Sequence, residues 1–182
     1  MFFIRKSSLE LLPVAMSGVR MGERALQIGI DDPALAGALA AKVGLSGHAA
    51  MAVADETSAG KAREAASRVG ALVDLKVTSL ESLPFSEASF DVVVVHGMRG
   101  LLSSMAQAAR TRTLHEAFRI LRPGGRIVII EAGPLGGIRG LLRPREVADA
   151  GETLAGLAQA GFRGSRVLVE REGYRFTEGM KA

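Results

Sequence analysis

One short stretch, residues 119–131, constrains the fold of this chain more than any other. Its sequence, RILRPGGRIVIIE, predicts the end of a helix, a forced turn and a buried strand. Pro123 cannot continue a helix because it has no amide hydrogen, and the two glycines after it can take turn conformations at little steric cost. The β-branched run at 127–130 is typical of a strand covered on both faces. A fold that repeats this helix–turn–strand pattern is therefore expected.

The same alternation of strands, turns and helices recurs along the chain. Further strands are predicted at residues 24–29, 49–54, 71–77 and 90–95. Helices are predicted at residues 34–43, from Thr57 or Ser58 to Val69, from Ser103 or Ser104 onward, and at 146–159. Asp32 is expected to cap the first of these helices, with Pro33 at its first position and Gly44 at its end.

The chain is expected to close with a hairpin. Residues 166–169 and 174–176 flank a tight connection at Glu172-Gly173. Strands that alternate with helices indicate a parallel sheet covered on both faces, to which the hairpin adds an antiparallel strand. We therefore expect one α/β domain over residues 1–182, with three Rossmann-like layers. Residues 1–23 are expected to form a lid or capping segment, which Pro13 interrupts.

Composition excludes several functional classes. No apolar run is long enough to cross a membrane, and the first residues do not form a secretory signal. Cysteine is absent, and the three histidines lack ligand spacing, so no metal site is expected. The net charge is +4, but acidic residues are interspersed and aromatics are only 4%, which argues against nucleic-acid binding. A cytoplasmic protein with a small-molecule partner is expected, and a homo-oligomer is left open.

Sheets of this kind bind ligands beyond the carboxyl ends of their strands. The residues that follow the predicted strands are therefore the candidates for a site. They are Gly29, Ile30 and Asp31, then Asp55, then Ser79 and Leu80, then His96, and finally Glu131.

Three stretches carry a resemblance to a known family. They are residues 83–94 (LPFSEASFDVVV), residues 121–126 (LRPGGR) and residues 52–55 (AVAD). The chain resembles the class I S-adenosylmethionine-dependent methyltransferases, in the small-molecule branch that includes quinone-biosynthesis enzymes. The resemblance covers roughly residues 24–176. It implies a seven-stranded, mostly parallel sheet with an antiparallel closing strand, and S-adenosylmethionine as the cofactor.

The stretch at residues 27–33 (QIGIDDP) departs from the family's cofactor loop. Gln27 replaces an acid, Gly29 alone remains of the loop's glycines, and Asp31 stands where the backbone passes closest to the cofactor. Ser79 replaces an acid near the adenine, and a hydroxyl bonds more weakly than a carboxylate. The resemblance thus implies a degenerate cofactor site. Its members would be Gln27, Gly29, Ile30, Asp31, Asp55, Glu56, Ser79 and Leu80.

Several of these residues have two interpretations. Asp55 could accept both hydrogen bonds of a ribose hydroxyl pair, or it could be a solvated loop acid. Asp31 and Asp32 could hold a cation or the cofactor's ammonium, although capping explains Asp32 well. Gly29 either admits the cofactor or only turns the chain.

His96 and Glu131 also carry two interpretations each. By the resemblance, His96 stands near the transferred methyl, and it could act as a general base for an acidic hydroxyl or carbon nucleophile. The alternative is a histidine packed against the sheet edge. Glu131 either lines the substrate side or caps the helix that follows.

Three functions remain open from the sequence. The first is methyl transfer from S-adenosylmethionine to a small molecule. The second is a methyltransferase-like binding or assembly module that has lost catalysis, which Gln27, Asp31, Pro33 and Ser79 motivate. The third is a nicotinamide-dependent oxidoreductase, against which the missing Gly-x-Gly-x-x-Gly motif and the closing hairpin argue.

Overall fold

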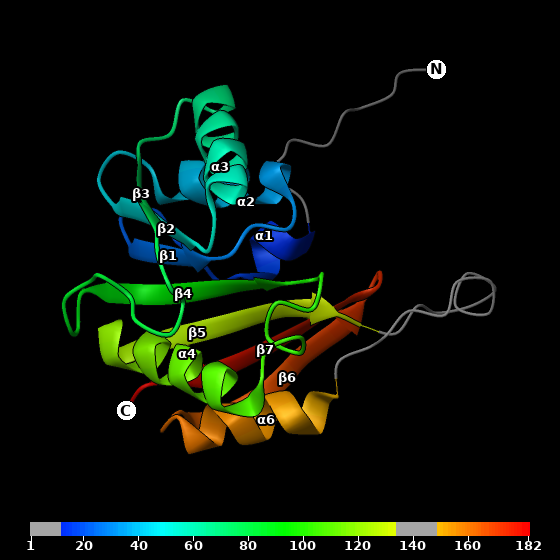
Figure 1. Cartoon of the computed structure of the whole chain (residues 1–182). Helices are drawn as coiled ribbons and strands as arrows, with labels where there is room; N and C mark the ends of the chain where they lie inside the picture. The colour runs from blue at the N-terminus through cyan, green and yellow to red at the C-terminus, as the bar shows by residue number, and fades with distance from the viewer. Residues whose placement is uncertain (1–11, 134–148) are drawn as a thin grey trace.

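The computed structural model describes residues 12–133 and 149–182, which build a sheet between two layers of helices (Figure 1). The strands are β1 (Arg24–Ile28), β2 (His48–Val53), β3 (Val73–Val77), β4 (Phe90–Gly97), β5 (Leu121–Ala132), β6 (Arg163–Arg171) and β7 (Tyr174–Met180). The helices are α1 (Leu12–Met16), α2 (Pro33–Val43), α3 (Glu56–Arg68), α4 (Gln107–Ile120) and α6 (Ala150–Gln159).

The sheet has seven strands in the order β3-β2-β1-β4-β5-β7-β6. The pairs from β3 to β5 are parallel, whereas β7 runs antiparallel to both β5 and β6. The predicted α/β class, with a mostly parallel sheet and an antiparallel closing strand, is confirmed. The strand order reverses between β1 and β4, which is where open sheets of this kind place their ligands.

The central strands are buried on both faces. Helices α1, α2 and α3 cover one face of the sheet, and α4 and α6 cover the other (Figure 1). In β4, Val92 and Val94 pack into the core beneath α2, and Val93 and Val95 pack into the core beneath α4. Because side chains alternate along a strand, the unbroken valine run serves two cores at once.

The predicted cap of the first long helix is confirmed. Asp32 accepts a hydrogen bond from the amide of Ala34 at 2.8 Å, and Pro33 is the first residue of α2. Gly44 ends the helix with φ of 70°. The helix therefore begins and ends where its own sequence demands.

Two other helix starts were predicted wrongly. Asp55, not Thr57 or Ser58, caps α3, because its carboxylate reaches the Ser58 amide at 2.8 Å. Helix α4 begins at Gln107 rather than at Ser103 or Ser104. Both serine hydroxyls donate to carbonyls of the preceding turn, so neither is left to cap a helix.

In residues 119–131, the structure has a longer strand than the sequence predicted. Helix α4 passes directly into β5 at Leu121, which pairs with Phe90. The register between β4 and β5 shifts between Phe90 and Val92, and Gly124 has φ of 76° at this irregularity. The strand therefore extends beyond the predicted residues 127–130, because strand pairing absorbs the turn as a bulge.

The closing hairpin is longer than predicted. Glu172 and Gly173 connect β6 and β7 with φ of 56° and 79°. Positive φ at both central residues is the signature of a type I′ turn, whose twist matches that of the flanking strands. Helix α6 begins at residue 150 with Asp149 as its cap, and the predicted residues 146–148 lie outside the described part of the chain.

The predicted N-terminal segment is described only from Leu12. Helix α1 contains Pro13, and Val14 is buried in the core formed with α2. The ammonium of Lys42 donates to the Val14 carbonyl at 3.1 Å, which ties α1 to α2. Residues 1–11 lie outside the described residues, so a lid over the site stays a prediction.

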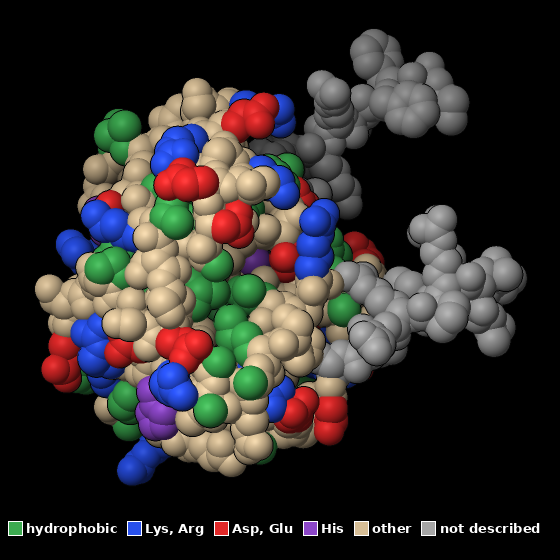
Figure 2. Space-filling view, viewed as in Figure 1, with side chains coloured by type: hydrophobic (Ala, Val, Ile, Leu, Met, Phe, Trp, Pro, Cys, Tyr) green, Lys and Arg blue, Asp and Glu red, His purple; other side chains and the backbone are tan. Residues whose placement is uncertain are grey.

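Acidic and basic side chains are interspersed over the face of the molecule seen in Figure 2. No helix in the described ranges is long and apolar enough to cross a membrane.

Candidate functional site

The candidate site lies at the carboxyl edge of the sheet, where β1 and β4 end side by side. Gln27 and His96 each lie two residues after a strand residue, Ala25 and Val94, that packs into the core beneath α2. Because residues two apart in a strand share a face, both side chains point toward α2. The Nε2 atom of His96 lies 2.8 Å from the Oε1 atom of Gln27. Gln27 is only 2% exposed and His96 only 1% exposed, so very little of either side chain is open to solvent.

Burial keeps His96 uncharged. Desolvation lowers the pKa of the imidazole from 6.5 to about 4, against the opposing influence of the Asp32 carboxylate. Near pH 7 the ring is therefore neutral, with one nitrogen protonated and the other carrying a lone pair. A side chain in this state accepts a hydrogen bond readily but is a weak acceptor of a full proton.

His96 lines a cavity of about 150 Å³ between α2, the end of β4 and the start of β7. The lining side chains belong to Asp31, Asp32, Leu35, His96, Met98, Arg99, Ile130 and Tyr174. A cavity of this size holds roughly one benzene ring, and it is smaller than the pockets that enclose larger ligands. It therefore fits a part of a ligand and cannot enclose a complete nucleoside.

Asp31 closes one side of this cavity. Its Oδ2 atom accepts a hydrogen bond from the backbone amide of Arg99 at 3.2 Å. The bond links the loop after β1 to the loop after β4, across the point where the strand order reverses. The neighbouring Asp32 does not link the two loops, because its carboxylate caps α2. The structure thus brings Asp31 and His96 together and assigns a structural role to Asp32.

Gly29 makes the turn at the end of β1. Its φ is 76°, a region that side-chain-bearing residues adopt only with strain, and its amide donates to the Ala52 carbonyl at 2.9 Å. A Cβ atom at this position would lie 2.7 Å from Cδ2 of Leu101. The next residue, Ile30, is partly buried and packs against the core beneath α2.

Asp55 follows β2 and is exposed. Its two carboxylate oxygens accept hydrogen bonds from the amide of Ser58 at 2.8 Å and from its hydroxyl at 3.0 Å. The amide bond of Ser58 is the main reason that the pKa of Asp55 is lowered. Glu56 beside it is exposed and forms an ion pair with Arg63 at 3.3 Å. Neither acid lines the cavity at His96.

Ser79 and Leu80 follow β3, and the two side chains lie in different environments. Ser79 is exposed, and its hydroxyl accepts a hydrogen bond from the amide of Glu81 at 3.3 Å. Leu80 is buried in the core beneath α4, together with Ile28. These two residues therefore flank the strand ends without lining the cavity.

Glu131 ends β5 on the opposite face of the sheet from His96. Its oxygens lie 3.1 and 3.0 Å from the hydroxyl of Thr153 in α6. Burial raises the pKa of this carboxyl, although the Thr153 hydrogen bond opposes the shift. The Glu131 carboxylate thus holds α6 against the sheet through Thr153, a residue inside the helix. It does not cap α6, because Asp149 does so.

Sequence reasoning missed five residues of the cavity, which are Met98, Arg99, Tyr174, Leu35 and Ile130. The first two follow the carboxyl end of β4, and that position was a signal that could have included them. Tyr174 is brought in by the pairing of β7 with β5, in which it lies opposite Ala132. No local pattern identifies such a neighbour.

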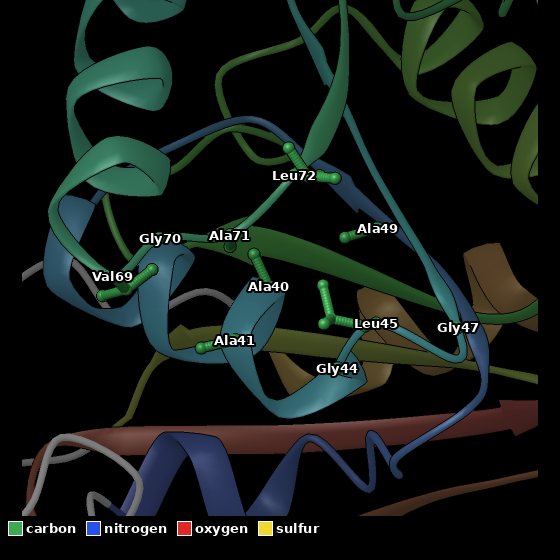
Figure 3. Close-up of a pocket in the computed structure, with 10 residues that line it drawn as sticks. All are labelled: Ala40, Ala41, Gly44, Leu45, Gly47, Ala49, Val69, Gly70, Ala71 and Leu72. Atoms are coloured by element: carbon green, nitrogen blue, oxygen red, sulfur yellow. The ribbon is translucent and has the colours of Figure 1, made fainter.

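A second cavity lies at the other edge of the sheet, where β2 and β3 begin (Figure 3). Its lining is formed by small and aliphatic residues such as Ala40, Leu45 and Leu72. It carries no titratable side chain, so it offers no chemistry. Among the described residues, no group of acids and histidines is arranged to hold a metal ion.

Comparison with known proteins gives matches of sequence and of fold. The model of a family described as a methyltransferase domain matches residues 28–129. The ubiquinone/menaquinone biosynthesis C-methyltransferase of Hydrogenovibrio crunogenus is 27% identical over 121 residues, which cover 65% of this chain and 45% of that protein. The chain thus spans less than half the length of this curated relative.

Solved structures share the fold at low sequence identity. A SAM-dependent methyltransferase from Aquifex aeolicus has a TM-score of 0.77 and 22% identity, covering 97% of this chain and 94% of that one. The structure of PigF with SAH has a TM-score of 0.62 and 19% identity, covering 88% of this chain and 51% of that one.

Proposed function

The chain belongs to the methyltransferase domain family, and from this premise we propose that it transfers a methyl group from S-adenosylmethionine to a small molecule. The observation that carries the proposal is the grouping of Asp31 and the uncharged His96 around one cavity at the carboxyl edge of the sheet. The family and its solved relatives support S-adenosylmethionine as the cofactor. The interspersed charges support a small-molecule acceptor rather than a nucleic acid.

The residues at this edge fit the chemistry of the cofactor. Asp55 keeps lone pairs beyond those that Ser58 uses, so its exposed carboxylate can accept hydrogen bonds from a ribose hydroxyl pair. Asp31 offers a negative charge to an ammonium group. When bound, S-adenosylmethionine supplies a methyl group that is already activated on a sulfonium. Little acid–base chemistry is then left for the protein.

The chain's own residues orient the acceptor and exclude water. His96 presents a neutral imidazole, which accepts a hydrogen bond from the acceptor and holds it in place. This role differs from that of a general base, one of the two interpretations that the sequence left open for His96, because a pKa of about 4 makes His96 a weak proton acceptor. Leu35, Met98 and Ile130 supply the apolar part of the cavity wall.

A second candidate is a binding or assembly module that keeps the fold without catalysis. Gln27 and Asp31 favour it, because both side chains already have protein partners. The side chain of Leu101 also lies close against Gly29. A homo-oligomer would suit this candidate better than the first.

Calorimetric titration with S-adenosylmethionine and with S-adenosylhomocysteine separates the two candidates. We expect micromolar binding, on the order of −8 kcal/mol, if the first proposal holds. Absence of heat with both compounds, together with no thermal stabilisation at millimolar ligand, would reject the first proposal and favour the second.

The variant Asp55→Asn tests the cofactor contact itself. Asparagine caps helices about as well as aspartate, so α3 should remain intact while the charged acceptor is lost. We expect roughly tenfold weaker cofactor binding, as for the loss of a hydrogen bond to a charged group. Asp149→Asn, at the cap of α6, is the matched control and should leave affinity unchanged. Equal affinity in all three proteins would remove Asp55 from the site.

A further inference from the structure

The orientation of the Gln27 side chain is fixed by the backbone of α2. Its amide nitrogen donates to the carbonyl of Ala36 at 3.0 Å. If the amide were turned over, its oxygen would face the Ala36 carbonyl oxygen, and two acceptors would meet in a buried site. Leaving both without a donor costs roughly 1–3 kcal/mol for each buried group. The nitrogen of Gln27 therefore faces Ala36, and its oxygen faces His96.

This orientation fixes the position of the proton on His96. The Gln27 oxygen can only accept, so the Nε2 atom of His96, at 2.8 Å from it, must be the donor. A neutral imidazole carries one N–H group, and the other nitrogen then holds a lone pair. Nδ1 is consequently the acceptor atom of the ring. The low exposure of both side chains keeps water from substituting for either partner.

The Nδ1 atom is the polar ring atom that remains for a ligand. The structure pairs Nε2 with Gln27 and records no protein partner for Nδ1 within residues 12–133 and 149–182. His96 lines the cavity, whereas Gln27 does not. The charged groups that share this lining are Asp31, Asp32 and Arg99. Of these, Asp31 is engaged with the Arg99 amide and Asp32 with the start of α2.

We propose that Gln27 is a positioning residue that fixes His96 with its proton on Nε2, so that Nδ1 is a permanent hydrogen-bond acceptor in the cavity. The resemblance implied that Gln27 contacts the cofactor, whereas in this proposal Gln27 acts through His96. The cavity then selects a ligand that presents an O–H or N–H donor at this point. The inference deepens the proposed function, because the selected ligand would be the methyl acceptor.

Long-range ¹H–¹⁵N correlation spectra of the imidazole rings in the free protein at pH 7 test the proton position. The chain has three histidines, so His48→Gln and His115→Gln assign the signals of the third. We expect a protonated Nε2 and an unprotonated Nδ1 at His96. A proton on Nδ1, or rapid averaging of the two nitrogens in the wild-type protein, would overturn the proposal. The result does not depend on whether S-adenosylmethionine binds.

The variant Gln27→Met tests whether Gln27 is what fixes the proton of His96 on Nε2. Methionine keeps the length of the side chain and removes the strong acceptor, so we expect the two His96 tautomers to become mixed. Gln159→Met, on the exposed end of α6, is the matched control and should show the wild-type spectrum. An unchanged tautomer in Gln27→Met would show that Gln27 does not position the ring. If that variant fails to fold, the wild-type spectrum still decides the proton position.

Two benzene-sized probes test the selection of a donor, because the cavity of about 150 Å³ is of that size. Phenol carries an O–H group, and toluene has a similar shape without one. We expect phenol to shift the Nδ1 resonance of His96 and toluene to leave it in place. Equal shifts with both probes, or no shift with either at saturating concentration, would overturn the assignment of this cavity as a donor-selecting site.

Discussion

The hydroxyl of Thr153 lies within hydrogen-bond distance of both carboxylate oxygens of Glu131, at 3.0 and 3.1 Å, and both residues are buried. This contact joins α6 to the end of β5. Gly97 lies opposite Glu131 in the sheet, and a Cβ atom there would be 3.1 Å from Cγ of Glu131. The absence of a side chain at position 97 therefore leaves room for the buried carboxyl.

Glu131→Gln should alter the pH dependence of stability. Burial raises the pKa of Glu131 in the folded protein, so its contribution to stability is complete below the unfolded value of 4.5 and is lost as pH rises through the folded value. Glutamine resembles the protonated acid and can still accept from Thr153. We expect Glu131→Gln to gain stability relative to the wild type as pH rises from 4 to 8, measured by urea unfolding.

The control for this experiment is Glu64→Gln. Glu64 is exposed and pairs with Arg68 on the surface of α3, so its replacement should have little effect at either pH. A parallel pH profile for Glu131→Gln and the wild type would show that burial does not perturb Glu131.

Gly29→Ala should destabilise the protein by about 2 kcal/mol or more. The φ of 76° costs an alanine roughly 1–2 kcal/mol, and its Cβ would press on Leu101 at 2.7 Å. Gly60→Ala is the matched control, because position 60 lies in α3 with nothing within 4 Å of an added Cβ. That change should stabilise the protein by about 1 kcal/mol. Chemical denaturation measures both, and similar effects at the two sites would contradict the strained turn.

His96 should make the protein less stable in acid. The unfolded chain protonates this histidine near pH 6.5 and the folded protein only near pH 4, because the ring is buried. The unfolded state therefore binds more protons in this window, and the free energy of unfolding should fall as pH drops from 6.5 to 4. The contribution amounts to about 3 kcal/mol.

Comparison of the wild type with His96→Gln isolates this contribution, because the other titrating groups are shared. We expect a shallower loss of stability between pH 6.5 and 4 in His96→Gln. His115→Gln, at an exposed position on α4, should retain the wild-type slope. Identical slopes in all three proteins would mean that His96 is not kept neutral by burial.

Glu172→Asn should stabilise the closing hairpin by up to about 1 kcal/mol. Glu172 has φ of 56° at the first central position of the type I′ turn, where asparagine is favoured over other residues with side chains. Glu172→Gln is the control, since it removes the same charge without improving the turn. Thermal unfolding of the two variants measures the difference, and equal midpoints would assign any effect to charge alone.

Local chemistry was enough to predict many of the elements. Asp32, Pro33 and Gly44 bound α2 as expected, because caps act through neighbours within a few residues. The hairpin turn at Glu172-Gly173 was found for the same reason. The start of α3 was missed because Asp55 was considered as a ribose-binding acid or a solvated loop acid, although its position also suits a cap.

The candidate site was predicted only in part. The position after the predicted strand at residues 90–95 pointed to His96, and the loop after β1 pointed to Asp31, because carboxyl ends of parallel strands meet at one edge. The partner of His96 was not predicted. Gln27 lies 69 residues away in the chain, and only the pairing of β1 with β4 and the packing of α2 bring the two side chains together.

The sequence by itself determined the alternation of strands and helices, the class of sheet and the edge at which a site would form, because these follow from hydrophobic periodicity and from turn residues. Only the tertiary structure decided that Gln27 faces His96, that Tyr174 joins the cavity and that Glu131 is buried against Thr153. Each of these contacts joins segments that are distant in the chain. Their distances and their exclusion of water depend on strand register and on helix packing, which local sequence patterns do not encode.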